Sequence, residues 1–209
     1  QRTRLADEML GARLGDIAAA DTLAVAELHA FGVEEQVELL RLWLAARGHP
    51  APRRSALQEF LRQLAASDDR VPLLDLGQAR LRRYQGRIHL ARQMPALASV
   101  YPVAAPGEVR LPHGVLRLVA DPDGFGPTGE LQVRFRHGGE RLLTRGRHRA
   151  LKQLFQEACV PPWLRAGYPL LYDALGVVAV PGLAHRDPPS AGGAAESGRW
   201  RAQWQPQAP

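Results

Sequence analysis

The sequence predicts an α+β protein of two domains, and three observations carry that prediction. Apolar residues recur at helical spacing through residues 1–66, and the pattern then switches towards alternation over residues 71–92. A proline-rich stretch with few charges follows at 95–107, after which short strand patterns surround one helical pattern. We therefore expect a domain at 1–94, a linker at 95–107, and a second domain at 108–209.

The first domain is predicted to be helical with a small β appendage. Apolar side chains repeat at three- and four-residue steps across residues 33–44, and Gly48 is suited to end that helix. The stretch Ser55–Gln58 has the pattern of a capping box and precedes another apolar stripe, which predicts a second helix. Residues 71–92 are punctuated by glycines and predict a small meander that closes the domain.

The second domain is predicted to be a mixed α+β domain built around one main helix at 148–159, with an apolar stripe on one side. Strand patterns lie on both sides of this helix. They are expected as a hairpin at 109–119, as strands at 131–136, 170–172 and 177–180, and as an edge strand around Trp200 and Trp204.

Composition excludes several classes of protein. The chain has 209 residues, of which 45% are hydrophobic and 23% charged, enough for a sizeable core. No apolar run reaches the roughly 18 residues of a membrane helix, and no signal-peptide pattern opens the chain. The single cysteine, Cys159, gives no reason to expect an oxidising compartment, so we expect a cytoplasmic protein without membrane contact. Because Gln1 leads directly into a helical pattern at 5–17, the chain reads as the interior of a longer one.

A dense group of cations occupies residues 131–152. Seven cations stand there against one acid, Glu140, in a chain whose formal net charge is +6. Strand alternation places Arg134 and Arg136 on one face, and Arg145 and Arg147 precede the predicted helix, whose first N–H groups could meet phosphate. Guanidinium groups suit an anionic partner such as a nucleic acid, although a merely solvated basic face gives the same pattern.

A second basic strip lies on the predicted meander. It holds Arg82 and Arg83, with further arginines at 80, 87 and 92, and Tyr84 could stack on a base. The alternative is that alternate strand positions face water and use arginine for that purpose.

Catalytic and metal-binding signals are weak, so we expect neither a catalytic residue nor a metal site in this chain. The adjacent acids at 34–35 and 68–69 point in diverging directions, and the histidines show no metal-ligand spacing. Cys159 has no paired histidine in sequence, and no glycine-rich loop of a recognised ATP-binding type occurs.

Several motifs in order resemble one known family. These are the arginine-rich strand Val133–Arg141, the run Gly146–Arg165 with its Val-Pro-Pro-Trp stop, and the strands Tyr168–Asp173 and Val177–Gly182. Together they resemble the C-terminal domain of tRNA(Ile)-lysidine synthases. The segments 39–44 and 81–90 are similar to the helical middle domain of that family and the part that closes it.

The resemblance implies a specific activity for the longer protein. Such enzymes are ATP-dependent carbon-nitrogen ligases that join lysine to the wobble cytidine of tRNA(Ile) with a CAU anticodon, a tRNA modification. ATP, Mg and lysine would be used by an N-terminal domain absent from this chain, which would itself need no cofactor and be inactive alone. The two domains present would hold the tRNA, the first near the anticodon side and the second near the acceptor stem.

The resemblance also indicates which residues contact tRNA. The residues carried over, together with two from the meander, are Arg134, Arg136, Arg141, Arg147, Lys152, Arg165, Arg82 and Arg83. Family members vary at 142–145, so Arg145 is not among them, and Arg165 could instead brace the fold through Asp173. Two rival functions stay open: a stand-alone RNA- or ribosome-binding module, and a protein-interaction domain that docks an acidic partner. The oligomeric state also stays open, with a dimer as one option.

Overall fold

The structure is a computed structural model that describes residues 20–66, 72–187 and 198–207; the helix expected at 5–17 lies outside them. The chain divides into two compact units between Gln93 and Met94. Helices and sheets occur together, so the predicted α+β class is confirmed.

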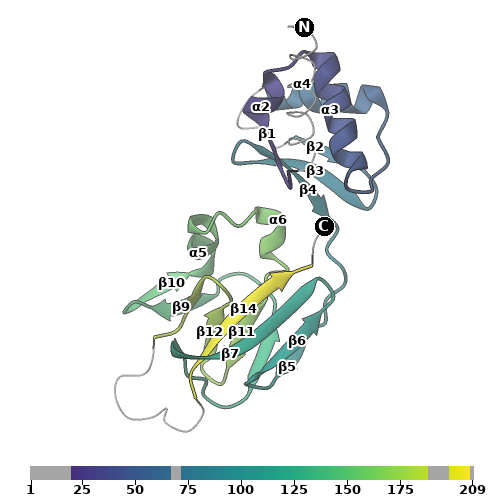
Figure 1. Ribbon diagram of the computed structural model, residues 1–209. Helices are drawn as coiled ribbons and strands as arrows, with labels where there is room; N and C mark the ends of the chain where they lie inside the picture. The colour runs from purple at the N-terminus through teal and green to yellow at the C-terminus, as the bar shows by residue number, and fades with distance from the viewer. Residues whose placement is uncertain (1–19, 67–71, 188–197, 208–209) are drawn as a thin grey trace, which may run out of the picture. The chain divides into compact units, whose positions relative to one another are not determined.

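The first unit packs helices on one face of a small sheet (Figure 1). Its elements are β1 (Leu23–Ala24), α2 (Val25–His29), α3 (Val33–Ala45), α4 (Arg54–Ala66), β2 (Leu73–Asp75), β3 (Ala79–Tyr84) and β4 (Arg87–Arg92). The strands are antiparallel in the order β1-β4-β3-β2. The meander expected at 71–92 therefore gains a strand from before the helices, because Leu23 pairs with Ile88.

The core of the first unit is centred on Trp43, which is fully buried among the apolar faces of α3, α4 and the sheet. Its indole Nε1 donates a hydrogen bond of 2.7 Å to the carbonyl oxygen of Ala20. A buried indole N–H needs such a partner, so this bond lets a large side chain fill the core.

The second unit is built mainly from strands. Its elements are β5 (Val100–Val103), β6 (Gly107–Leu111), β7 (Gly114–Phe125), β8 (Leu131–Arg134), β9 (Arg141–Thr144), β10 (Arg147–Ala150), α5 (Leu151–Glu157), α6 (Pro162–Arg165), β11 (Leu170–Asp173), β12 (Gly176–Val180), β13 (Ala184–His185) and β14 (Trp200–Pro206). They form a five-stranded sheet β13-β12-β11-β8-β5, a three-stranded sheet β14-β7-β6 and the two-stranded hairpin β9–β10. The edge strand expected around Trp200 and Trp204 is β14.

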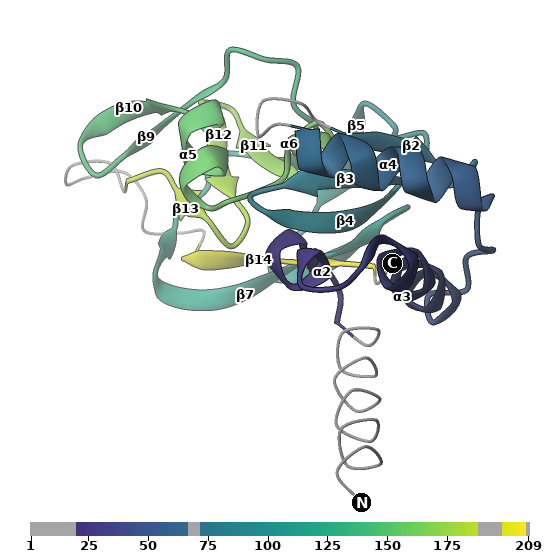
Figure 2. The same ribbon diagram turned by 90° about the horizontal axis from the view of Figure 1, so that it is seen from above.

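Two apolar clusters hold the second unit together. One joins the five-stranded sheet to the three-stranded sheet and includes Leu116, Phe125 and Val133. The other lies under α5 and joins Phe155 to Leu142 of the hairpin. Figure 2 shows the hairpin beside α5 at one end of the unit.

Two local expectations differ from the structure. Residues 100–103 of the expected linker form β5, which pairs with β8. Pro102 is tolerated there because β5 is an edge strand with one side free of partners. The helix expected at 148–159 begins only at Leu151, because the residues before it pair with β9 as β10.

We predict that Trp43→Ala lowers the free energy of unfolding by about 3–5 kcal/mol, since it removes a fully buried ring and leaves a cavity. Urea unfolding followed by far-ultraviolet circular dichroism measures the change. The matched control is Leu42→Ala at the preceding position of α3, where the side chain is 53% exposed. Equal losses in the two variants would contradict this account of the core.

Candidate nucleic-acid interface

The basic segment at 131–152 runs from β8 through the hairpin β9–β10 into the first turn of α5. Strands β9 and β10 pair antiparallel, with Arg147 opposite Thr144, and turn through Arg145 and Gly146. Both turn residues have positive φ, 54° and 70°, as a tight two-residue hairpin turn requires. The expected phosphate site at a helix N-terminus is therefore wrong, because Arg145 and Arg147 belong to the hairpin and α5 starts later.

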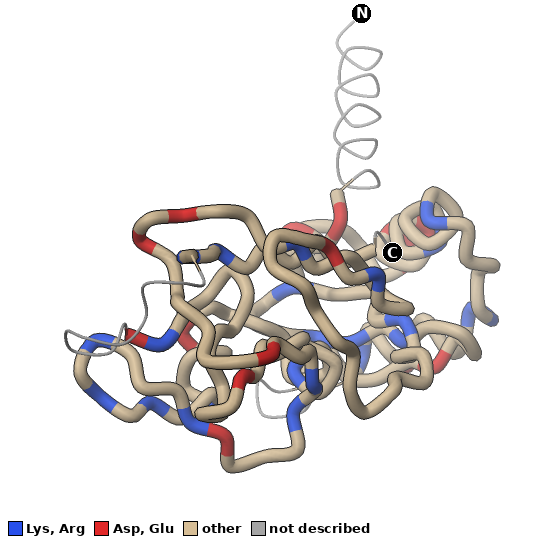
Figure 3. Tube along the Cα trace, turned by 90° about the horizontal axis from the view of Figure 1, so that it is seen from below, with Lys and Arg blue, Asp and Glu red and all other residues tan. Residues whose placement is uncertain are grey.

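Four exposed cations of this segment lie on the hairpin or on the first turn of α5. They are Arg141, Arg145, Arg147 and Lys152, and none forms an ion pair with a carboxylate in the part of the chain that the structure describes. Figure 3 shows Lys and Arg along the hairpin trace. Three of these four, Arg141, Arg147 and Lys152, are among the tRNA contacts predicted from the sequence. The structure places them at the surface of β9–β10 and of the first turn of α5. We call these four residues the hairpin cations.

Two further arginines of the segment form ion pairs within the unit. The guanidinium of Arg136 lies 3.6 Å from the carboxylate of Glu140 and over the ring of Phe155. Arg149 pairs with Glu157. These ion pairs leave Arg136 and Arg149 less available to an external anion than the hairpin cations.

Arg134 is exposed but stacked on its own sheet. Its Nη2 donates to the side-chain oxygen of Gln132 at 2.9 Å, and its guanidinium lies 5.1 Å from the centre of the Tyr172 ring. One face of the Tyr172 ring is therefore covered by Arg134. The exposed edge of this guanidinium can still donate to an anion, because it carries five N–H groups.

Arg165 ends helix α6, and its Nε donates to the carbonyl oxygen of Val160 at 2.8 Å. Asp173 pairs instead with Arg186, so the bracing contact considered for Arg165 is made by another arginine. The sequence offered no signal for this choice, since both arginines lie within a few residues of the same strands.

The two residues from the meander lie on β3 of the first unit. Arg82 and Arg83 are adjacent on a strand, so their side chains leave opposite faces of the sheet. Arg83 donates to the carbonyl oxygen of Leu64 at the end of α4, and the neighbouring Arg80 pairs with Asp75. The structure thus divides this strip between two faces, where the sequence suggested one continuous basic strip.

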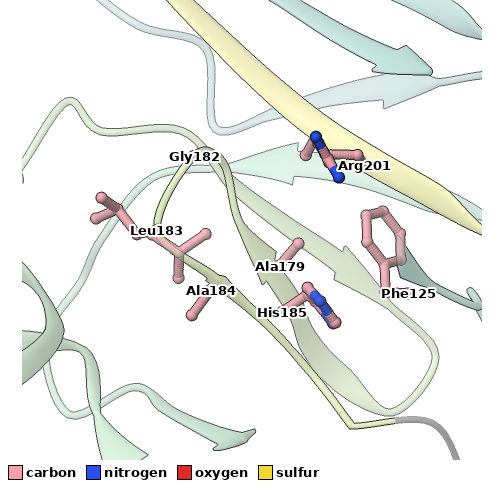
Figure 4. A pocket seen from close by; sticks show the side chains of 9 residues that line it. Phe125, Ala179, Gly182, Leu183, Ala184, His185 and Arg201 are labelled. Atoms are coloured by element: carbon pink, nitrogen blue, oxygen red, sulfur yellow. The ribbon is translucent and has the colours of Figure 1, made fainter. Parts of the chain in front are cut away.

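A hollow of about 320 Å³ in the second unit separates β12 and β13 from β14 (Figure 4). Phe125 and Ala179 are part of its lining, and His185 and Arg201 are its two lining residues that can carry charge. The lining holds no carboxylate, hydroxyl or thiol side chain, so it offers no pair of groups for acid–base or nucleophilic catalysis.

Across 20–66, 72–187 and 198–207, no three His, Cys, Asp or Glu side chains gather as metal ligands would. No helix in these ranges has the length and apolar character to span a membrane.

Asp187 contacts the hairpin, and the sequence analysis did not single it out. The carboxylate of Asp187 accepts hydrogen bonds from the backbone N–H groups of Arg145 and Gly146, at 2.8 and 2.6 Å. The pKa of Asp187 is held below its ordinary value by the N–H of Gly146 first and that of Arg145 next. Asp187 lies 42 and 41 positions after Arg145 and Gly146, so no local sequence pattern predicts the contact.

Two family models match the chain. The TilS substrate binding domain matches residues 23–89, and the TilS substrate C-terminal domain matches residues 131–204. The hairpin cations lie within the second match, and Arg82 and Arg83 within the first.

Curated relatives match most of the chain. A tRNA(Ile)-lysidine synthase of Methylococcus capsulatus is 34% identical over 182 residues, covering 80% of this chain and 40% of the relative. One of Salmonella agona is 32% identical over 201 residues, covering 88% and 45%. The chain thus spans less than half the length of these relatives. A solved structure, described as the crystal structure of TILS C-terminal domain, is 23% identical with a TM-score of 0.40 and covers 53% of this chain and 99% of that chain.

We predict that stability depends on pH through Asp173, whose side chain is fully buried beside Arg186, 13% exposed. Burial raises the pKa of Asp173, but hydrogen bonds from Arg186 and from the N–H groups of Thr128 and Leu175 outweigh it and hold that pKa below the ordinary value. A lowered folded-state pKa means that the stabilisation is present above the unfolded-state value of about 3.9 and is lost as pH falls below it.

Asp173→Asn should therefore lower the free energy of unfolding at neutral pH by about 3 kcal/mol, since it leaves a buried arginine without its anion. It should also flatten the acid limb of the stability profile. Chemical unfolding between about pH 3 and pH 7 measures both effects. Glu130→Gln, at an exposed position of the same unit, is the control. An unchanged acid limb in Asp173→Asn would exclude this carboxyl as its source.

Proposed function

Because this chain belongs to the tRNA(Ile)-lysidine synthase family, of which it carries the substrate binding domain and the substrate C-terminal domain, we propose that it is the tRNA-holding part of such an enzyme. The observation that carries the proposal is the set of hairpin cations, exposed and without an acidic partner among the described residues. Contacts between cations and phosphates supply most of the affinity of proteins for nucleic acids.

The arrangement of these cations supports contact with an RNA backbone. Arg145 and Arg147 lie at the tip of a two-stranded ribbon, while Lys152 lies on the first turn of the adjacent α5. Each arginine can hold two phosphate oxygens through a planar fork, whereas the lysine acts as a mobile point charge. Phosphate contacts of this kind orient a nucleic acid but do not read its sequence.

The remaining predicted contacts are secondary in this proposal. Arg134 can reach an anion from its stacked position, and Arg82 and Arg83 add positive charge to the first unit. Arg136 serves mainly to hold Glu140, and Arg165 the turn at Val160. The first unit is proposed as the tRNA-recognition domain, and the second as a further tRNA-binding domain.

The chemistry of the whole enzyme is part of the proposal. The matched relatives extend well beyond the matched part, since the chain covers 40% and 45% of their lengths. We assign to such additional sequence the ATP- and Mg-dependent joining of lysine to the wobble cytidine of tRNA(Ile) with a CAU anticodon. A cytoplasmic location follows from that substrate.

The first test is the affinity of the chain for isoleucine tRNA with a CAU anticodon and for elongator methionine tRNA across a salt series. We expect salt-sensitive binding of the isoleucine tRNA, and Arg147→Ala should reduce the slope of log affinity against log salt by about one unit for each lost phosphate contact. A preference for the isoleucine tRNA would place discrimination in these two domains.

The matched control is Arg110→Ala, which removes the same charge from β6, where the side chain is 84% exposed. Its slope should change less than that of Arg147→Ala. Equal slopes in both variants would mean that the hairpin is only a solvated face. Failure of the wild-type chain to bind tRNA at low salt would favour an acidic protein partner.

We predict that the 209-residue chain alone gives no ATP-dependent transfer of lysine to tRNA. Its sequence has no glycine-rich loop of a type that cradles nucleotide phosphates, and the lining of the hollow in the second unit lacks a nucleophile or an acid–base pair. Incorporation of radiolabelled lysine into isoleucine tRNA measures this. Turnover by the purified chain would overturn the division of labour proposed here.

A further inference from the structure

The hairpin β9–β10 needs support from outside itself. An isolated two-stranded ribbon is marginally stable in water, and this one has four residues in each strand. Its base is held by Leu142, which is fully buried in the cluster under α5. Its tip, Arg145 and Gly146, is exposed and receives no support from that cluster.

The carboxylate of Asp187 supplies the support at the tip. In a turn with two successive positive φ values, the two N–H groups converge and can bind one anion. Asp187 takes both of these hydrogen bonds, one on each carboxylate oxygen. The backbone N–H of Asp187 also donates to the carbonyl oxygen of Leu143 at 3.0 Å, so the residue is fastened to β9 as well.

Asp187 is itself fastened to the body of the second unit through its neighbour Arg186. The backbone N–H of Arg186 donates to the carbonyl oxygen of Val178 at 2.7 Å, and its guanidinium forms the ion pair with buried Asp173. One short segment thus connects β11 and β12 of the five-stranded sheet to the tip of the hairpin.

The negative charge of Asp187 is unfavourable at this position. A carboxylate beside the hairpin cations lowers the positive potential that attracts phosphate, so charge alone makes Asp187 unfavourable to RNA binding. An aspartate is ionised at neutral pH, and the two N–H groups hold the pKa of Asp187 further below its ordinary value, so the carboxylate is charged there. Its contribution to binding must therefore come from the geometry that it imposes.

We propose that Asp187 is a positioning residue of the RNA-binding surface, which holds the hairpin tip in one orientation so that Arg145 and Arg147 are aligned before RNA arrives. The proposal rests on the proposed function. In this proposal an acidic side chain favours the binding of a polyanion, because it preorganises the groups that make the contacts.

The test compares two ways of removing one negative charge. Asp187→Ala removes the charge and the anchor, and we expect the affinity for isoleucine tRNA at about 0.15 M salt to fall about tenfold, the cost of ordering two arginine side chains on binding. The control, Glu157→Gln, removes a charge from the end of α5, where the carboxylate pairs with the side chain of Arg149, and leaves the turn untouched. Its affinity should be equal to or tighter than that of the wild type.

If Asp187 positions the hairpin, Asp187→Ala should weaken tRNA binding. If Asp187 acts only as a negative charge, the same variant should bind tRNA equally or more tightly. Weaker binding in Asp187→Ala with tighter or equal binding in Glu157→Gln supports positioning. Equal or tighter binding in Asp187→Ala would overturn it, because the residue would then act only as a negative charge. Thermal unfolding of both variants verifies that the second unit is folded.

A second measurement needs no RNA and separates this proposal from the proposed function. Hydrogen exchange of the Arg145 and Gly146 amides, followed by NMR, should be slow in the wild type, faster in Asp187→Asn and fastest in Asp187→Ala. If wild-type chain binds no tRNA, the proposed function fails, and exchange still decides whether Asp187 anchors the turn. Unchanged exchange in both variants would overturn the anchor itself.

Discussion

The candidate interface depends on the apolar cluster beneath α5. Phe155 and Leu142 are fully buried there, and the hairpin and helix that carry the exposed cations are attached to the five-stranded sheet through them. A ribbon of four residues per strand has too little surface of its own to stay ordered, so the burial of Leu142 determines where the basic residues are presented. A hydrophobic contact therefore determines where the positive charge of this surface lies.

A second constraint is the repulsion among seven cations within 22 residues of sequence. The structure meets it by engaging some of them internally: Arg136 with Glu140 and Arg149 with Glu157. Arg134 is held by stacking on Tyr172. The hairpin cations stay in water, where a high dielectric constant makes their mutual repulsion small. This division separates arginines that stabilise the unit from those available to an RNA backbone.

Asp187 and Arg186 show how an anchor from distant sequence can organise a functional surface. Arg186 is held by a buried carboxylate, and Asp187 by two backbone N–H groups of the turn. These adjacent residues of opposite charge thus have different roles: Arg186 bonds to the five-stranded sheet, and Asp187 bonds to the hairpin turn. The positive φ values at Arg145 and Gly146 are what turn both N–H groups towards one carboxylate.

The sequence by itself determined the fold class, the basic character of 131–152 and the family resemblance, because periodicity, charge and motif order are local properties of the chain. It also indicated the edge strand at Trp200 and Trp204. Only the tertiary structure decided that 147–150 pairs as a strand rather than starting a helix, that Pro102 lies in an edge strand, and that Asp173 meets Arg186 rather than Arg165. It also decided which arginines of 131–152 stay exposed, since the pairing of Arg136 with Glu140 and of Arg149 with Glu157 depends on how the chain folds between β8 and α5.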